Sequence, residues 1–157
     1  MKEKEIIQQF LSLLSKYWDD PKAHQGFRLL RKQVSSQSRW QEIIDARLMA
    51  LDGKIEDSVT LLKGILAGEP GNVYALLLLG SILCYDNNQP AEAISIYESI
   101  LGNITSGQPH LDWLLALTLT RRGMRLWKQA NYTRPFRLMM PWSSVLMVLM
   151  NFPFRRS

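Results

Sequence analysis

Apolar residues recur at helical spacing along most of this chain, and short polar stretches divide the pattern into helix-sized segments. The first segment, residues 3–18, has one broad apolar stripe opposite a polar side. The stripe consists of Ile6, Ile7, Phe10, Leu11, Leu14, Tyr17 and Trp18. This spacing predicts an amphipathic helix that extends to Trp18.

A second helix is expected after the Asp19-Asp20-Pro21 stretch. Asp20 is a good capping residue, and proline suits the first position of a helix. The helix is predicted to end near Val34, with Ala23, Phe27, Leu30 and Val34 facing inward. The Ser-rich residues 35–38 read as a turn, so residues 1–38 form a leading hairpin that covers the apolar end of the next segment.

Residues 40–101 contain two copies of one helix-turn-helix pattern, which becomes visible when Ala46 is aligned with Gly80 at a spacing of 34. The first copy has Ala46, Met49, Gly53, Ser58, Leu62, Ile65 and Pro70, and the second has Gly80, Leu83, Asn88, Ala93, Tyr97 and Ile100. The later matches fall at 35, which predicts one inserted residue in a turn near 87–90. Small residues at matching positions allow two antiparallel helices to approach closely.

The two copies, LMALDGKIEDSVTLLKGILAGEP and NVYALLLLGSILCYDNNQPAEAISIYESIL, resemble the tetratricopeptide repeat (TPR) family. Gly80, Ala93, Tyr97 and the junction Gly-Glu-Pro-Gly-Asn fit the family pattern, whereas Asp45 stands where the family has Leu or a similar residue. The resemblance implies an all-α solenoid of antiparallel helix-turn-helix repeats with about six to eight helices. We expect repeats at residues 39–72 and 73–108, and a partial repeat at 109–134 that aligns Ala116 with Gly80.

Composition and charge add an asymmetry to this picture. The 157 residues suffice for one domain, and a single cysteine, Cys84, excludes an internal disulfide. The formal net charge is +5, but residues after Asp112 carry +8 and no acid, which leaves −3 for the first 112 residues. The acidic start Met-Lys-Glu-Lys-Glu does not fit a secretory signal peptide.

Residues 135–157 form a basic and apolar C-terminal tail, whose apolar run from Leu138 to Phe152 is only 15 residues long and contains Pro141. A membrane-spanning helix needs about 20 apolar residues, so no span is predicted. Three roles remain open: a helix that caps the array, a segment for partner binding or self-association, and a helix that lies on a membrane surface. The abrupt change in composition also allows that this end is not the ancestral one.

The sequence contains no pattern typical of an enzyme, a metal site or a cofactor site. His24 and His110 lie far apart, no glycine-rich phosphate loop is present, and Glu56-Asp57 is explained by its place at a helix start. We therefore expect no catalysis, no cofactor and no metal. Nucleic acid is not expected either, because the basic residues of the tail alternate with Leu, Met and Trp instead of forming a hydrophilic stripe.

The TPR resemblance also implies a binding surface, since the first helix of each repeat in that family lines a concave groove. The corresponding positions here are Trp40, Ile43, Arg47, Ala50, Leu51, Tyr74, Leu77, Ser81, Cys84, Tyr85, Trp113, Leu117 and Arg121. Core and groove are equally good interpretations for Ile43, Leu77 and Leu117. Trp40, Arg47, Tyr74, Tyr85 and Arg121 are better groove candidates, because amphipathic side chains tolerate partial exposure.

These features predict a protein that binds the amphipathic helix or peptide of a partner protein. The chain also resembles bacterial type III secretion chaperones in its size, in the expected absence of a signal sequence and in the Leu-Met-Ala-Leu-Asp-Gly-Lys stretch. This resemblance implies a cytoplasmic protein that holds an export substrate. The alternative is a membrane-associated assembly or scaffold factor, held at the inner face of a membrane by its basic apolar tail.

Overall fold

The computed structural model describes residues 2–16, 18–35 and 38–101, and this part of the chain is all-α. Its helices are α1 (Glu3–Leu14), α2 (Pro21–Gln33), α3 (Arg39–Leu51), α4 (Ile55–Gly68), α5 (Val73–Tyr85) and α6 (Pro90–Leu101). None of these helices is long and apolar enough to cross a membrane. The predicted partial repeat at 109–134 and the tail at 135–157 lie outside the described residues.

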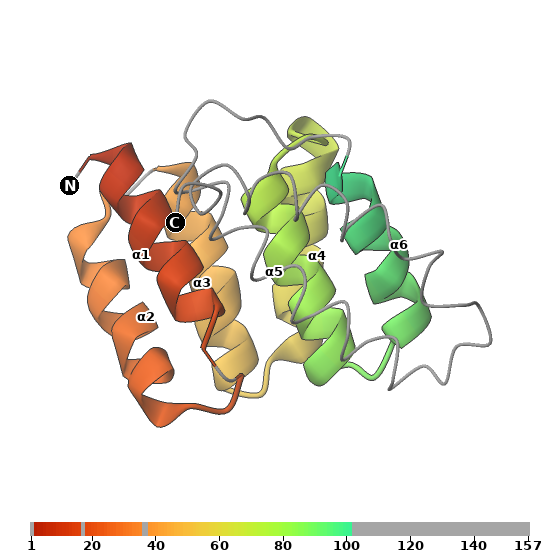
Figure 1. Ribbon diagram of the computed structural model, residues 1–157, viewed down its shortest axis with the longest axis horizontal. Coiled ribbons are helices and arrows are strands. Elements are labelled where there is room, and N and C mark those ends of the chain that lie inside the picture. The colour runs from red at the N-terminus through yellow and green to blue at the C-terminus, as the bar shows by residue number, and fades with distance from the viewer. Residues whose placement is uncertain (1, 17, 36–37, 102–157) are drawn as a thin grey trace, which may run out of the picture.

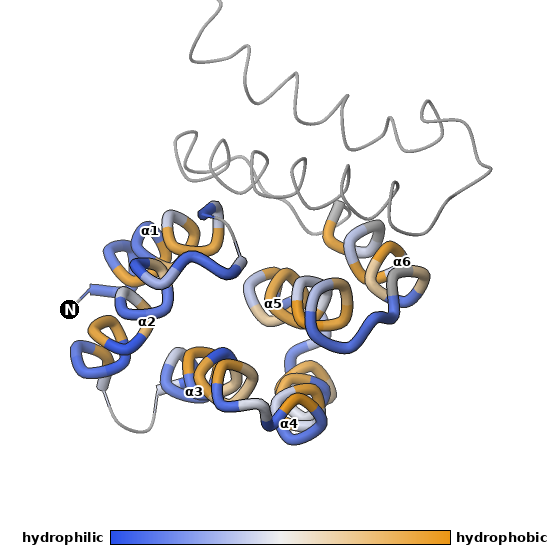
Figure 2. The backbone as a smooth tube through the Cα atoms, turned by 90° about the horizontal axis from the view of Figure 1, so that it is seen from below, coloured by the Kyte–Doolittle hydropathy of each residue, from blue (hydrophilic) through white to orange (hydrophobic). Residues whose placement is uncertain are grey.

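The six helices form three antiparallel hairpins that stack side by side (Figure 1). Each helix packs against the next one in the chain, and α3 also packs against α5. Figure 2 views the stack nearly end-on, with α1 and α2 on one side, α3 and α4 below, and α5 next to α6. The first helices of neighbouring hairpins are therefore neighbours in space, as in a repeat array.

The leading hairpin confirms most of the predicted pattern and corrects one end of it. Asp20 caps α2 by accepting a hydrogen bond of 2.9 Å from the Lys22 amide, and Pro21 is the first helical residue. The predicted inward residues of this helix, Ala23, Phe27, Leu30 and Val34, are all buried. However, α1 ends at Leu14 rather than at Trp18. Trp18 leaves the helical stripe because its ring packs between α3 and α5.

The two predicted repeats contain the close helix contacts that their small residues indicate. A Cβ atom on Gly80 would lie 2.8 Å from Cε1 of Tyr97, so a side chain at this position would force the Tyr97 ring or the helices to shift. In the preceding hairpin, the Ser58 hydroxyl donates a hydrogen bond of 2.6 Å to the Ala46 carbonyl of α3. These contacts confirm that Gly80 and Ser58 face the partner helix of their hairpins.

The predicted one-residue insertion also lies where the spacing placed it. The turn between α3 and α4 consists of residues 52–54, whereas the turn between α5 and α6 consists of residues 86–89. Gly53 and its counterpart Asn88 both have a positive φ, at 84° and 48° respectively. The extra residue therefore lengthens the turn between α5 and α6. Both turns keep one residue with a left-handed backbone conformation.

The α5 helix is the centre of the described core. All residues from Ala75 to Cys84 are buried, because α5 packs against both α4 and α6 as well as α3. The helix contains no charged residue, which agrees with the rule that a helix apolar on all sides is a buried one. Figure 2 shows apolar residues around most of α5 and polar residues on the outer sides of α2 and α4.

Candidate functional site

The predicted groove residues on α3 and α5 fall into separate groups according to their position along these helices. Trp40, Ile43 and Tyr74 lie near the beginning of these helices, where they line one open cavity. Arg47 and Tyr85 lie toward the other end, and both contact the Trp18 ring. Three further candidates, Trp113, Leu117 and Arg121, lie outside the described residues.

The positions in the middle of α5 belong to the core. Leu77, Ser81 and Cys84 are fully buried. The Ser81 hydroxyl donates a hydrogen bond of 2.9 Å to the Leu77 carbonyl and lies 2.7 Å from the hydroxyl of Tyr97 on α6. Ser81 thus faces the second helix of its own hairpin, so it does not form part of an open groove. Ala50 is also buried, while Leu51 is partly exposed.

The cavity lies where α1, α3 and α5 begin, and its volume is about 580 Å³. It is lined by Glu3, Ser38, Arg39, Trp40, Ile43, Glu69, Gly71, Asn72, Val73 and Tyr74. These residues come from two connecting segments as well as from the three helices. Its volume falls in the range of about 300–1,000 Å³ that ligand pockets occupy.

Two aromatic rings, Trp40 of α3 and Tyr74 of α5, stand in the wall of the cavity, and Phe10 of α1 packs behind them. The Trp40 ring centroid lies 5.1 Å from that of Tyr74 and 5.2 Å from that of Phe10 on α1. The Phe10 and Tyr74 rings are also in edge contact, with centroids 6.3 Å apart. Because both rings pack on it, Trp40 is only 7% exposed, so it lines the cavity with little open surface, and its role in partner binding stays a prediction. Tyr74 remains partly exposed.

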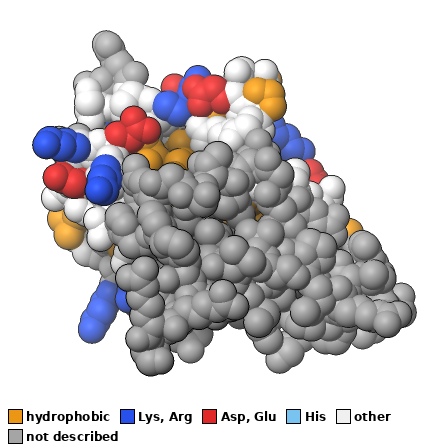
Figure 3. All heavy atoms as spheres, turned by 45° about the horizontal axis from the view of Figure 1, so that its top comes forward, with side chains coloured by type: hydrophobic (Ala, Val, Ile, Leu, Met, Phe, Trp, Pro, Cys, Tyr) orange, Lys and Arg blue, Asp and Glu red, His pale blue; other side chains and the backbone are white. Residues whose placement is uncertain are grey.

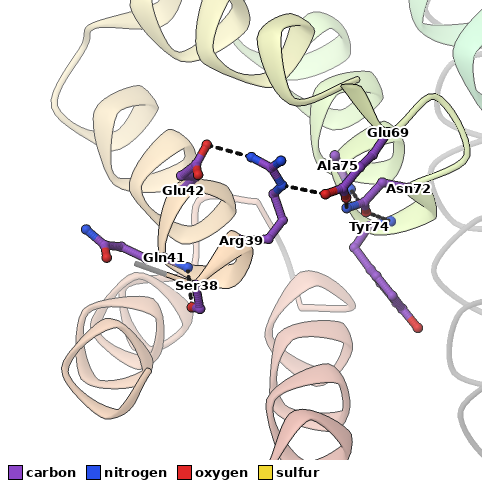
Figure 4. A network of polar contacts seen from close by, with 8 residues as sticks. All are labelled: Ser38, Arg39, Gln41, Glu42, Glu69, Asn72, Tyr74 and Ala75. Atoms are coloured by element: carbon purple, nitrogen blue, oxygen red, sulfur yellow. Dashed lines mark hydrogen bonds and ion pairs between the residues drawn. The ribbon is translucent and has the colours of Figure 1, made fainter. Parts of the chain in front are cut away.

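A polar network borders the cavity, and Figure 4 shows it from close by. Arg39 on α3 donates one hydrogen bond of 2.9 Å to Glu42 and another of 2.8 Å to Glu69, which follows α4. Asn72 donates to the second oxygen of Glu69 at 2.9 Å. The hydrogen bonds from Asn72 and Arg39 hold the pKa of the Glu69 carboxyl below its usual value. This carboxylate therefore stays charged over the whole physiological pH range.

Two of the helices that begin at this cavity, α3 and α5, are capped by side chains. The Ser38 hydroxyl accepts a hydrogen bond of 3.2 Å from the Gln41 amide of α3. Asn72 accepts hydrogen bonds of 3.1 Å from the amides of Tyr74 and Ala75. Figure 3 turns this end of the molecule toward the viewer and shows hydrophobic side chains between acidic and basic ones.

A second cluster of side chains lies near the other end of α3 and α5 and consists of Trp18, Arg47, Tyr85 and Asp86. The Arg47 guanidinium lies 3.5 Å from the centroid of the Trp18 ring and donates a hydrogen bond of 3.1 Å to the Trp18 carbonyl. The Trp18 and Tyr85 rings are stacked with centroids 5.4 Å apart, and the Trp18 indole donates to Asp86 at 3.0 Å. Arg47 is only 2% exposed, so the expectation that it is an accessible groove residue is wrong.

Sequence reasoning identified the aromatic wall of the cavity but missed its polar border. Arg39, Glu69 and Asn72 stand in turns or at helix starts, where polar residues are common and carry no periodic signal. The junction Gly-Glu-Pro-Gly-Asn marked the place where two of them lie, yet it gave no reason to expect an ion pair with α3.

The described residues contain no group of three or more His, Cys, Asp or Glu side chains that could hold a metal ion. No protein-family model matches the chain, and comparisons with curated proteins and with solved structures give no match. The residues that line the cavity offer an apolar wall, carboxylates and one guanidinium.

Proposed function

We propose that this chain is a non-catalytic protein-interaction module of TPR-like build. It binds a peptide or helix of a partner protein at the cavity where α1, α3 and α5 begin. The observation that carries this proposal is the open cavity of about 580 Å³, with Trp40 and Tyr74 in its wall and a polar network at its border.

The arrangement suits an anchor side chain of a partner. Binding energy in protein interfaces concentrates in a few apolar or aromatic side chains that fill a pocket surrounded by polar contacts. The wall supplies aromatic surface from α3 and α5, and the partly exposed Tyr74 can be reached from solvent. The Arg39–Glu69 pair joins α3 to the segment between α4 and α5, which fixes the two sides of the cavity before a partner arrives.

Selection from a displayed library of random peptides tests this function. The bait is the full chain, and each selected peptide is then measured against Tyr74→Ala and Leu29→Ala. Leu29 is a suitable control because it is 49% exposed on α2 and does not line the cavity. Circular dichroism first establishes that both variants fold.

The expected result is a set of peptides that lose at least tenfold in affinity with Tyr74→Ala and keep their affinity with Leu29→Ala. A selection that returns no binder, or binders indifferent to Tyr74→Ala, would refute the cavity as a peptide site.

A further inference from the structure

The charges at the cavity indicate what kind of peptide it accepts. Glu3, Arg39 and Glu69 are the charged residues among those that line it. Arg39 is held by two carboxylates at once, through Glu42 at 2.9 Å and Glu69 at 2.8 Å. Its positive charge is therefore more than balanced within the protein itself, and the border of the cavity is acidic.

The two lining carboxylates retain capacity for further donors. Each oxygen of Glu69 accepts one hydrogen bond from the network, although an ionised carboxylate offers about four acceptor positions. Glu3 is the first residue of α1, it is exposed, and it forms none of the ion pairs that join described residues. An ammonium or guanidinium group at the border can thus be received without displacing Arg39.

By themselves, the helix N-termini that meet at the cavity would favour an acidic partner, because the positive end of a helix dipole attracts anions. Here that attraction is already satisfied. Ser38 and Asn72 cap α3 and α5, and acidic side chains occupy the first turn of α1 and of α3. An incoming anion would find the capping positions of α3 and α5 occupied and carboxylates beside them.

The apolar wall complements a basic partner as well. Lys and Arg carry long aliphatic stems that pack on apolar surface while their charged heads stay near water. The face of an aromatic ring such as the partly exposed Tyr74 also attracts cations. A basic side chain beside an aliphatic or aromatic residue would therefore use both the wall and the acidic border.

We infer that the cavity binds a basic, apolar peptide segment, in which a Lys or Arg contacts the Glu3 and Glu69 carboxylates and an apolar neighbour packs against Trp40 and Tyr74. This inference rests on the proposed function, because it names the partner chemistry of the same cavity. Its contacts come from α1, α3, α5 and the segment before α5.

Three fluorescent synthetic peptides test the inference with the full chain. One peptide alternates Lys with Leu and Trp, the second replaces each Lys by Glu, and the third replaces each Lys by Ser. Fluorescence anisotropy gives their affinities at low and at high salt. The basic peptide should bind at least tenfold more tightly than the acidic one at low salt, and the difference should shrink at high salt because exposed charges are screened.

A pair of matched variants locates the effect. Glu3→Gln with Glu69→Gln removes the two lining carboxylates, and the glutamine can still accept a hydrogen bond from Arg39. Glu56→Gln with Asp57→Asn changes the net charge equally on the exposed first turn of α4, away from the cavity. The first pair should weaken the basic peptide about five- to tenfold, as two exposed ion pairs would, and the second should leave it unchanged.

The outcomes separate the partner chemistry from the function. If the acidic or the neutral peptide binds as tightly as the basic one and loses affinity with Tyr74→Ala, the inference fails and the peptide site stands. The Tyr74→Ala criterion matters because the residues after Asp112 carry eight basic side chains that could attract an acidic peptide elsewhere. If the control pair weakens the basic peptide as much as the cavity pair does, the inference fails too. If none of the three peptides binds, the proposed function itself fails.

Discussion

Gly80 and Gly64 both lie within helices, but alanine at these two positions should change the free energy of unfolding in opposite directions. A Cβ on Gly80 would lie 2.8 Å from a ring atom of Tyr97, and that ring is fully buried with its hydroxyl close to Ser81. Gly80→Ala should therefore lower the free energy of unfolding by about 1–3 kcal/mol through overpacking. A Cβ on Gly64 would meet no atom within 4 Å, so Gly64→Ala should raise it by up to about 1 kcal/mol through helix propensity.

Urea denaturation of the two variants measures both changes. The sign is decisive, since intrinsic propensity alone would make alanine stabilising at either position. Stabilisation by Gly80→Ala would show that the α5–α6 contact has more room than the structure contains.

The environment of the Asp86 carboxyl leads us to expect that the stability of the fold depends on pH. Partial burial raises the pKa of its carboxyl above the ordinary 3.8, although the hydrogen bond from Trp18 and the charge of Arg47 oppose that shift. A raised pKa means that the folded state holds this proton more tightly than the unfolded state does. The contribution of Asp86 to stability is thus complete below pH 3.8 and decreases as the pH rises through its folded pKa.

Asp86→Asn removes this titration while keeping a side-chain oxygen that can accept from Trp18. The stability of the variant relative to the parent chain should therefore increase between about pH 3.8 and neutral pH. Thermal unfolding at a series of pH values gives the difference. A constant difference would mean that Asp86 titrates alike in the folded and the unfolded chain.

At the scale of the helix, Asn72 links the stability of α5 to the shape of the cavity. Its side-chain oxygen accepts from two backbone amides of α5, and its nitrogen donates to Glu69. Asn72→Ala should cost about 0.5–2 kcal/mol, the usual value for a lost N-cap. Asn72→Asp keeps the capping oxygen but places a second carboxylate beside Glu69, so it separates the cap from the link to Glu69.

Unfolding in denaturant, followed by peptide binding, distinguishes the two functions of Asn72. Asn72→Ala should lower both stability and affinity, whereas Asn72→Asp should mainly change affinity. An unaltered free energy of unfolding with Asn72→Ala would contradict the capping role.

The helices were predictable because their signals are local or periodic. Asp20-Pro21 marks the start of α2, and the spacing between the two repeats located the longer turn at residues 86–89. The end of α1 was not predictable, because Trp18 continues the apolar period while its ring interacts with Arg47, 29 residues later. Such a contact depends on how the hairpins stack, which periodicity does not encode.

The residues of the cavity show the same limit to what can be predicted from the sequence. Trp40 and Tyr74 could be assigned to the inner face from the repeat pattern, but their exposure could not. Phe10 from the leading hairpin covers Trp40. Nothing in the sequence around either residue indicates that these two rings are in contact. Arg47 is the clearest case, since an arginine on a groove position suggested exposure and the Trp18 ring instead buries it.

At the scale of the whole molecule, Trp18 changes how the described hairpins cooperate. In a simple repeat array each unit contacts only its neighbours, so stability is nearly a sum of local terms. Here the segment between α1 and α2 reaches the third hairpin, where Trp18 stacks on Tyr85 and donates to Asp86. The first and third hairpins are thus joined directly, in addition to their contacts with the second.

Trp18→Ala should therefore do more than lower total stability, for which we expect a loss of about 2–3 kcal/mol because the ring is only partly buried. It should also allow the leading hairpin to open without the rest of the array. Native-state hydrogen exchange measures this, since the protection of amides in α1 and α2 should fall more than that of amides in α6. An equal loss of protection in all three helices would mean that the hairpins remain one cooperative unit without the Trp18 contact, coupled by neighbour packing and by the Phe10–Tyr74 contact.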